Sequence, residues 1–342
     1  MEKKITIAVD CMGGDNAPSA VIGGIDLLLK RNSGIFFLLY GDKNKIESCL
    51  ARKPRVRQFS KVVHTDIFVD ANEKPHIAVR QKDTSVRLAI ESVKNGEADA
   101  VISAGNTGAY MAVAKLILKT IVGIDRPALI QLMPSLGAPV AFLDMGANLE
   151  CNSTNLYQFA FMGSAFYRAV NDIENPSVAI LNIGSEEMKG SDVVKNTSIL
   201  LRESVLKNSY KGYIESNNVL NGTVNVVVTD GWTGNIALKA IEGASKTFMS
   251  IIKSGFKSGF FPIIGYILAS RGIKKAKEKV SHKRYNGAML VGVNGIVVKS
   301  HGNADEESFS YAIKNTINLI KNKVNDNIIS YIQVAEEDER ID

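Results

Sequence analysis

The sequence predicts an α/β fold whose sheet is largely parallel and covered by helices on both faces. Short apolar runs rich in β-branched residues recur along the 342 residues, and about ten or more residues with a helical period separate most of them. These runs are apolar at successive positions, as expected of strands that are buried on both faces. The chain has no internal repeat and no Pro- or Ser-rich linker. We therefore expect residues 1–330 to form one α/β domain.

The individual strands can be placed from these apolar runs. They are expected, in chain order, over residues 5–10, 35–40, 61–65, 99–103, 140–145, 178–183, 224–229, 288–293 and 296–300. No strand pattern occurs between residues 231 and 283, and we expect a protruding helical insertion over about 245–283. Residues 324–342 end in an acidic run and are expected to be a loose tail, with 331–342 outside the domain.

Composition limits the classes of function. The formal net charge of +6 suits an acidic partner or an anionic surface, and no nucleic-acid partner is expected. The three cysteines form no CxxC pair and the four histidines show no metal-ligand spacing, so we expect no disulfide framework, no metal and a reducing cytoplasm. No signal peptide is expected before the first strand, and no run approaches the ~20 apolar residues that span a bilayer.

Polar, glycine-rich loops follow six of the expected strands, those ending near residues 10, 103, 145, 183, 229 and 300. Taken singly, each loop fits a tight turn followed by a helix cap. Because the carboxyl ends of parallel strands meet at one edge, the six loops together predict an anion-binding crevice there. The candidate binding residues are Asp10, Gly13, Gly14, Asn16, Gly105, Asn106, Thr107, Gly108, Asn148, Gly184, Glu186, Thr233, Gly234, Asn235 and His301.

Three side chains in these loops have two interpretations each. Lys189 is either a solvated loop lysine or a cation that faces an anionic substrate. Asp230 is either a helix-capping carboxylate or a polar anchor in the crevice, and for His301 we favour a structural role. The chain lacks GxGxxG, GxxxxGK[ST], HExxH and GxSxG, which argues against dinucleotide, P-loop, zinc-protease and serine-hydrolase chemistry.

A set of motifs resembles the bacterial phosphate acyltransferase family. They are AVDCMGGDNAP (8–18), KDTSVRLAI (82–90), VISAGNTGA (101–109), GIDRPAL (123–129), DMGANLEC (144–151), QFAFMG (158–163), LNIGSEEMKG (181–190), DGWTGNIALK (230–239) and GVNGIVVKSHGNAD (292–305). The resemblance implies transfer of a long acyl chain from acyl carrier protein to inorganic phosphate, which gives acyl phosphate for phospholipid synthesis. It also implies a Rossmann-like three-layer αβα sandwich similar to the phosphotransacetylase and isopropylmalate dehydrogenase group.

The resemblance further implies partners and a location. It implies a homodimer in the cytoplasm, peripheral association with the inner face of the cell membrane, and no redox cofactor or metal. A downstream glycerol-3-phosphate acyltransferase is a further expected partner. Two alternatives stay open from the residues: a dehydrogenase of the isopropylmalate type, for which we find neither a nicotinamide nor an aspartate metal pattern, and a non-enzymatic membrane scaffold that binds acyl carrier protein.

The expected chemistry needs no strong base. Phosphate is already anionic, and the leaving thiol has a pKa of ~8.5, so positioning, charge neutralisation and oxyanion donors suffice. We expect direct attack without an acyl-enzyme. Lys189 is expected to hold phosphate and stabilise developing charge, and Asp230 to orient Lys189 or the phosphate. The side chains of Asn106, Thr107, Thr233 and Asn235 are expected to act as donors.

The helical insertion carries a membrane prediction. Its apolar residues are Phe260, Phe261, Ile263, Ile264, Ile267 and Leu268, and lysines and an arginine flank them on both sides. Apolar residues between cations suit an anionic membrane surface or an acidic carrier protein. A helix buried in a dimer interface is the alternative and is compatible with both.

Overall fold

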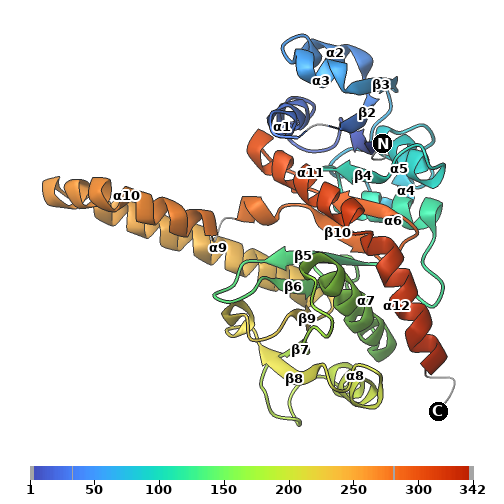
Figure 1. Cartoon of the computed structure of the whole chain (residues 1–342), viewed down its shortest axis with the longest axis vertical. Helices are drawn as coiled ribbons and strands as arrows, with labels where there is room; N and C mark the ends of the chain where they lie inside the picture. Colours follow the sequence, from blue (N-terminus) through green and yellow to red (C-terminus); the bar gives the residue numbers. More distant parts are fainter. Residues whose placement is uncertain (1–3, 33, 280–281, 339–342) are drawn as a thin grey trace.

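The computed structural model describes residues 4–32, 34–279 and 282–338. Within this part, eleven strands form one sheet in the order β3-β2-β1-β4-β11-β10-β5-β6-β9-β7-β8 (Figure 1). The strands are β1 Ile5–Asp10, β2 Ile35–Gly41, β3 Ser60–His64, β4 Ala100–Ser103, β5 Ala128–Met133, β6 Val140–Leu143, β7 Val178–Asn182, β8 Tyr210–Glu215, β9 Val226–Val228, β10 Ala288–Val291 and β11 Ile296–Lys299.

Helices cover both faces of this sheet. They are α1 Ser19–Leu29, α2 Lys43–Leu50, α3 Pro54–Gln58, α4 Pro75–Ala78, α5 Ser85–Lys94, α6 Thr107–Leu118, α7 Ser153–Asn171, α8 Asp192–Glu203, α9 Gly231–Phe256, α10 Phe260–Lys279, α11 Glu306–Lys321 and α12 Val324–Asp338, with 3-10 turns at Val219–Asn221 and His282–Tyr285. One apolar cluster packs α1, α7, α11 and α12 on one face, and a second packs α5, α6 and the start of α9 on the other. The predicted three-layer αβα sandwich is confirmed.

Successive residues along a strand alternate between these two clusters. In β1, Ile7 and Val9 enter the first cluster, while Ala8 enters the second. A strand that is apolar at successive positions is therefore buried on both faces. The sequence prediction missed two strands because polar residues or glycine interrupt their apolar runs. Strand β5 contains Gln131, and β8, the last strand on one side of the sheet, contains Lys211 and Gly212.

The sheet reverses direction in its middle. Strand β10 is antiparallel to both β11 and β5, and β5 is antiparallel to β6. On one side β3, β2, β1, β4 and β11 are mutually parallel, and on the other side β6, β9, β7 and β8 are. These two parallel sets run in opposite directions. The carboxyl ends of the strands in one set therefore lie beside the amino ends of the strands in the other set, on opposite sides of the sheet.

The end of the described chain is a helix instead of a loose tail. Val324, Ile328 and Ile332 are buried along one side of α12, which packs against α7. Their spacing of four residues matches the helical period, so the prediction of a loose tail from residue 324 is wrong as far as Ile332. Residues 339–342 of the predicted acidic end lie outside the described residues.

Helices α9 and α10 form a hairpin that leaves the body of the protein (Figure 1). The first turns of α9 pack Ala237, Leu238 and Ile241 against the sheet, and its later residues are largely exposed. This is the protruding helical insertion that the sequence predicted. Among the described residues, no helix is both long and apolar enough to cross a membrane.

Candidate functional site

The six polar loops do not meet at one edge, so that part of the sequence prediction is wrong. The reversal of strand direction in the middle of the sheet separates the six loops into two sets of three. We call the loops after β1, β4 and β11 loop group 1 (residues 11–18, 104–106 and 300–305). The loops after β6, β7 and β9 are loop group 2 (residues 144–152, 183–191 and 229–235). Local sequence patterns could not reveal this, because strand direction depends on pairing between distant segments.

Asp10 organises the centre of loop group 1. Its carboxylate accepts 2.7 Å hydrogen bonds from the hydroxyls of Ser85 and Ser103, and a 3.2 Å bond from the backbone N–H of Met12. The hydroxyl of Ser103 in turn accepts from the N–H of Gly105. Asp10 is 3% exposed. In this arrangement the predicted binding residue Asp10 holds two loops together, and the sequence prediction missed its two serine partners.

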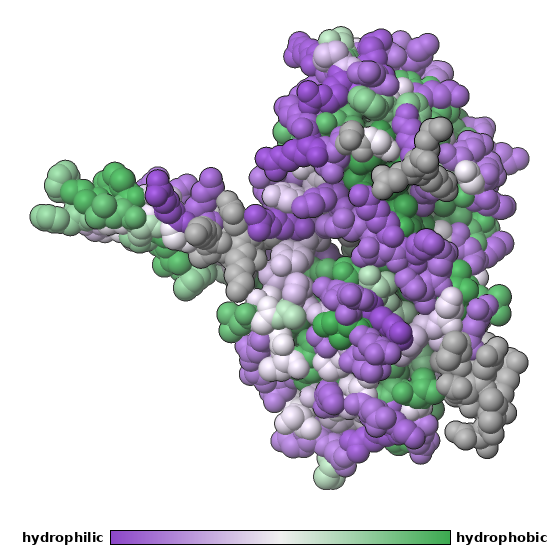
Figure 2. All heavy atoms as spheres, in the orientation of Figure 1, coloured by the Kyte–Doolittle hydropathy of each residue, from purple (hydrophilic) through white to green (hydrophobic). Residues whose placement is uncertain are grey.

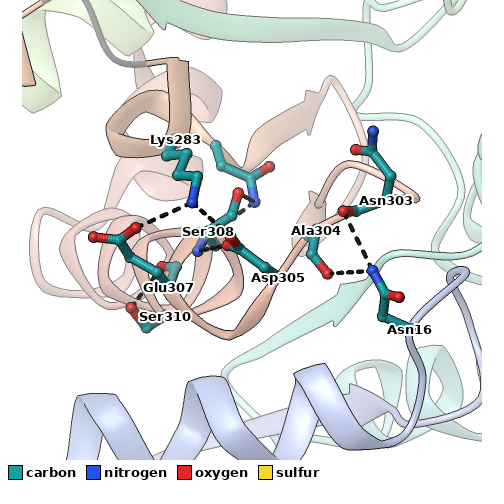
Figure 3. A network of polar contacts seen from close by, with 9 residues as sticks. Asn16, Lys283, Asn303, Ala304, Asp305, Glu307, Ser308 and Ser310 are labelled. Atoms are coloured by element: carbon teal, nitrogen blue, oxygen red, sulfur yellow. Dashed lines mark hydrogen bonds and ion pairs between the residues drawn. The ribbon is translucent and has the colours of Figure 1, made fainter. Parts of the chain in front are cut away.

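The predicted amide donors of loop group 1 are engaged within the protein. Asn16 donates from Nδ2 to the carbonyl oxygens of Asn303 and Ala304, which joins the loop after β1 to the loop after β11 (Figure 3). Asn106 caps α6 by accepting from the N–H of Ala109, and its Nδ2 donates to two backbone carbonyls. Thr107, at the start of α6, has a hydroxyl with no hydrogen bond to any described residue.

Glycines in this group allow backbones to touch. A Cβ on Gly14, whose φ is +103°, would lie 2.9 Å from the Cβ of Ala104 and 3.0 Å from the oxygen of Gly302. A Cβ on Gly108 would lie 3.0 Å from Cγ of Pro75. The glycines that predicted close approach to a ligand therefore accommodate neighbouring protein atoms.

His301 connects loop group 1 to the hairpin. Its Nε2 lies 3.9 Å from Oε1 of Glu242 in α9, and its N–H donates to Oδ1 of Asn286. Lys283, in the 3-10 turn between the hairpin and β10, bonds Asp305 at 2.5 Å and Glu307 at 3.1 Å at the start of α11 (Figure 3). These hydrogen bonds raise the pKa of Lys283. The base of the hairpin is thus anchored by charge.

Lys299, directly before loop group 1, is a further residue that the sequence prediction missed. It ends β11, is 8% exposed, and donates from Nζ to the carbonyl oxygen of Ser300. Burial lowers the pKa of Lys299 to about 8, although Asp10 and Asp15 act in the opposite direction. A signal was present in the sequence, because a lysine that closes an otherwise apolar strand is unusual in a core.

Loop group 2 is built around Asp144. Its buried carboxylate accepts from the N–H groups of Leu129, Gly146, Ala147 and Asn148 and from Nδ2 of Asn148, at 2.8–3.2 Å. Burial raises the pKa of Asp144, and these hydrogen bonds oppose the rise. The side-chain amide of Asn148, a predicted binding residue, also donates to the carbonyl of Pro127 at 2.8 Å.

Asp230 caps α9, as one of its two sequence interpretations predicted. Its oxygens accept from the N–H and the hydroxyl of Thr233, both at 2.8 Å. Gly231 and Gly234 bring this helix end onto the Asp144 loop, since a Cβ on Gly231 would lie 2.7 Å from the Asn148 oxygen. Asn235, which has no side-chain hydrogen bond to a described residue, lies beside Gly146.

Lys189 lies in the same loop group but does not contact Asp230. It is exposed, its N–H donates to the Glu186 oxygen, and its carbonyl accepts from Nδ2 of Asn182. Gly184 packs under this loop, since a Cβ there would lie 3.1 Å from Cγ of Lys189. Among the residues that the structure describes, no hydrogen bond or ion pair joins Lys189 to Asp230.

Cys151 and Arg126 complete loop group 2. Burial, followed by the charges of Asp144 and Asp230, raises the pKa of Cys151 to about 12, so its thiol is poorly suited to be a nucleophile. Arg126 is exposed beside it and donates to the carbonyl of Glu150 at 3.0 Å. The sequence prediction included Arg126 in a motif without giving it a role.

The two loop groups are joined by α9. Asp230 caps its start, and Glu242 reaches His301 roughly 18 Å further along the axis, at about 1.5 Å per residue. One small ligand cannot touch the residues of both groups at once in this arrangement.

Comparison with known proteins agrees with the fold and the motifs. The family described as "Fatty acid synthesis protein" matches residues 5–327. A protein of Paramagnetospirillum magneticum named phosphate acyltransferase is 45% identical over 329 residues, which cover 96% of this chain and 94% of the relative. A Rhodospirillum rubrum protein of the same name is 43% identical over 98% of this chain and 97% of its own. The chain belongs to the phosphate acyltransferase family.

Family membership makes the chain an acyltransferase and decides against the dehydrogenase and scaffold alternatives. Its fold is shared with more distant enzymes. A phosphotransacetylase from Streptococcus pyogenes superposes with a TM-score of 0.60 at 17% identity, covering 94% of this chain and 95% of that one. The EutD phosphotransacetylase from Staphylococcus aureus gives 0.58 at 18% identity, covering 94% of each chain. This likeness confirms the predicted fold group.

Proposed function

We propose that this phosphate acyltransferase family member transfers a long-chain acyl group from acyl carrier protein to inorganic phosphate. The observation that carries the proposal is the identity of 43–45% to relatives named phosphate acyltransferase over nearly the whole chain. The product, an acyl phosphate, is an activated acyl donor for phospholipid synthesis.

The proposed step is a direct acyl transfer. A phosphate oxygen attacks the thioester carbonyl, the C–O bond forms, and the C–S bond breaks from the tetrahedral oxyanion. The proton of hydrogen phosphate ends on the departing thiolate, so atoms and charge balance. Because the nucleophile is already anionic, the protein must mainly position it and neutralise charge. The high pKa of Cys151 agrees with a route that forms no acyl-enzyme at this thiol.

We assign the reacting groups to loop group 2. Lys189 stabilises the charge that develops during transfer and holds phosphate, and the carboxylate of Asp230, which also caps α9, orients the phosphate. The side-chain amide of Asn235, which has no hydrogen bond to a described residue, and the N-terminal end of a long helix suit an anion at this place. The candidate residues of loop group 1, together with Thr107 at the start of α6, contribute substrate contacts on the other side of the sheet.

The hairpin is assigned to the membrane. Phe260, Phe261 and Leu268 are 74%, 82% and 81% exposed, and Ile263, Ile264 and Ile267 are also exposed. Figure 2 shows hydrophobic residues gathered at the free end of the hairpin. Lys253, Lys257 and Arg271 flank this end and favour an anionic surface. We propose peripheral attachment to the inner face of the cell membrane by this end.

A homodimer is part of the same proposal. Along α9, Trp232 and Ile236 are exposed near its start, and Phe248 and Ile251 are exposed further along it. Exposed apolar side chains of this kind are suited to pack against a second copy. A membrane-bound dimer would deliver acyl phosphate directly to a downstream glycerol-3-phosphate acyltransferase.

The reaction can be tested with purified protein and palmitoyl-acyl carrier protein, with and without inorganic phosphate. The release of free carrier thiol and the formation of acyl phosphate are followed together. Thiol release that requires phosphate and matches acyl phosphate in amount supports the proposal. Thiol release without phosphate, or none across several chain lengths, contradicts it.

A further inference from the structure

Lys299 carries a buried ammonium group that the proposed reaction does not use. The residue is 8% exposed, and Nζ donates one hydrogen bond, to the carbonyl oxygen of the adjacent Ser300. No carboxylate of the described residues lies within ion-pair distance of it. An ammonium has three N–H donors, so two of them have no acceptor among the described protein atoms. Buried charges are normally paired, which makes this arrangement costly unless a ligand completes it.

The position of Lys299 is defined by the sheet register. Ser103 of β4 pairs with Lys299 of β11, and Asp10 of β1 follows the pair of Val9 with Ile102. Because side chains alternate along a strand, Asp10, Ser103 and Lys299 form a row on one face at the carboxyl end of three adjacent parallel strands. The loops of group 1 leave the sheet directly beyond this row.

Neighbouring carboxylates do not satisfy Lys299. Both oxygens of Asp10 already accept hydrogen bonds from serine hydroxyls, which keeps this carboxylate turned toward Ser85 and Ser103. Asp15 is exposed in the loop after β1. Both carboxylates act on Lys299 electrostatically, yet burial still lowers the pKa of the ammonium. The charge is therefore held close to loop group 1 with spare donors and without a direct counter-ion in the part of the chain that the structure describes.

We propose that Lys299 binds a phosphate group of the substrates at the carboxyl end of β11. This inference rests on the proposed function, whose substrates offer phosphate oxyanions from two sources. One is the inorganic phosphate acceptor, and the other is the phosphodiester that joins the acyl-bearing arm to the carrier. In either case the two free N–H donors of Lys299 meet phosphate oxygens in a desolvated site, where charge-assisted hydrogen bonds are strong.

The two sources have different consequences for loop group 2. If Lys299 binds the carrier's phosphodiester, Lys189 keeps its proposed role at the reacting centre. If Lys299 binds inorganic phosphate, the acceptor lies in loop group 1 and the assignment to Lys189 falls. The same kinetic experiment separates these cases.

The test compares Lys299→Met with a matched control, Lys314→Met. Methionine keeps the unbranched stem and removes the charge, and Lys314 is an exposed lysine on α11. We expect Lys299→Met to raise KM for phosphate or KM for palmitoyl-carrier about 10- to 100-fold, the range for losing a hydrogen bond to a charged group. The control should leave both values unchanged. If Lys299→Met changes neither the KM for phosphate nor the KM for palmitoyl-carrier, the proposal is overturned.

Thermal unfolding adds a readout that needs no turnover. If inorganic phosphate is the ligand, it raises the Tm of the wild type and of Lys314→Met but not of Lys299→Met. If inorganic phosphate shifts the Tm of all three proteins equally, and Lys299→Met raises only the KM for the carrier, then the ligand of Lys299 is the carrier's phosphodiester. A wild type that forms no acyl phosphate refutes the proposed function, while the Tm comparison still tests phosphate binding by Lys299.

Wild-type protein provides a measurement that does not depend on a variant folding. Cyanate carbamylates neutral amines, and peptide mass spectrometry reports the rate at each lysine. We expect inorganic phosphate or the carrier to slow carbamylation of Lys299 several-fold while leaving Lys314 unchanged. If Lys299 is carbamylated to the same extent with either ligand as without any ligand, the proposal is overturned.

Discussion

Gly13 and Gly105 lie in contact at the ends of β1 and β4. A Cβ on Gly13 would stand 2.6 Å from the nitrogen of Gly105, and a Cβ on Gly105 would stand 3.2 Å from Cα of Gly13. Gly13 has no room for a side chain, and at Gly105 a side chain would fit only if its neighbours shifted. The two glycines therefore let neighbouring loops approach each other directly above the Asp10 carboxylate.

Gly13→Ala should destabilise the protein by this crowding. The added carbon would meet backbone atoms that cannot rotate away, and overpacking of this kind costs about 1–3 kcal/mol. Gly243→Ala is the control, because a Cβ there meets nothing within 4 Å and alanine favours a helix. Urea unfolding measures both. A Gly13→Ala protein as stable as the wild type would contradict the contact.

Much of the fold could be predicted from local patterns. Apolar runs such as 5–10 and 35–40 coincide with β1 and β2, because a strand buried on both faces has a distinct sequence. Strand β8 lies at the sheet edge, where polar residues are tolerated, and lacked that pattern. The helical stretch from Gly231 was also predicted, since its length exceeds any strand.

The candidate site was harder to predict. The composition of the loops does not distinguish residues that cap helices or form turns, such as Asn106 and Asp230, from residues that bind ligands. Which loops lie together depends on the antiparallel pairs of β10 and β5, segments that are distant in sequence from most loops. Lys299 was overlooked although a lysine that ends an apolar strand is a signal, and how deeply it is buried depends on tertiary packing.

Lys189→Met should lower turnover without affecting folding. Lys189 is exposed and no ion pair to the described residues is lost, so we expect the Tm to stay constant. If it stabilises charge in the transition state, kcat should fall by ~10²–10³. Lys211→Met, an exposed lysine on β8, is the control. Near-normal turnover of folded Lys189→Met would remove Lys189 from the proposed mechanism.

Two substitutions separate the capping role of Asp230 from a chemical role. Asp230→Ala removes the acceptor for the Thr233 N–H and should cost about 1 kcal/mol of stability. Asp230→Asn keeps a good capping oxygen but removes the charge. We expect Asp230→Asn to unfold like the wild type while its turnover falls. Full turnover of Asp230→Asn would leave Asp230 with the capping role alone.

Charged residues at the end of the hairpin should release the protein from membranes. In Phe260→Glu/Phe261→Glu, two exposed apolar side chains become anionic, which opposes both burial in lipid and attraction to an anionic surface. Co-sedimentation with phosphatidylglycerol vesicles measures the loss. Val122→Glu, at a position 88% exposed on the body, is the control. Equal binding of the double variant and the wild type would contradict the membrane assignment.

The buried ammonium of Lys299 should also make stability depend on alkaline pH. Its pKa is about 8 in the folded protein, against about 10.4 for lysine in an unfolded chain. Between these values the unfolded chain holds a proton that the folded chain has released, so the folded state becomes more stable as pH rises. The carboxylates that act on Lys299 are those of Asp10 and Asp15, and both favour its charged form.

A shift of this size corresponds to about 3 kcal/mol of free energy of unfolding gained between pH 8 and 10.5. Lys299→Met lacks the titrating group and should lack this gain, while other lysines and tyrosines affect both proteins alike. Urea unfolding in phosphate-free buffer gives the difference between them at each pH. That difference should move in favour of the wild type as pH rises, because burial of the charge penalises the wild type only while Lys299 is protonated. A difference that stays constant would mean that Lys299 is not held in a desolvated site.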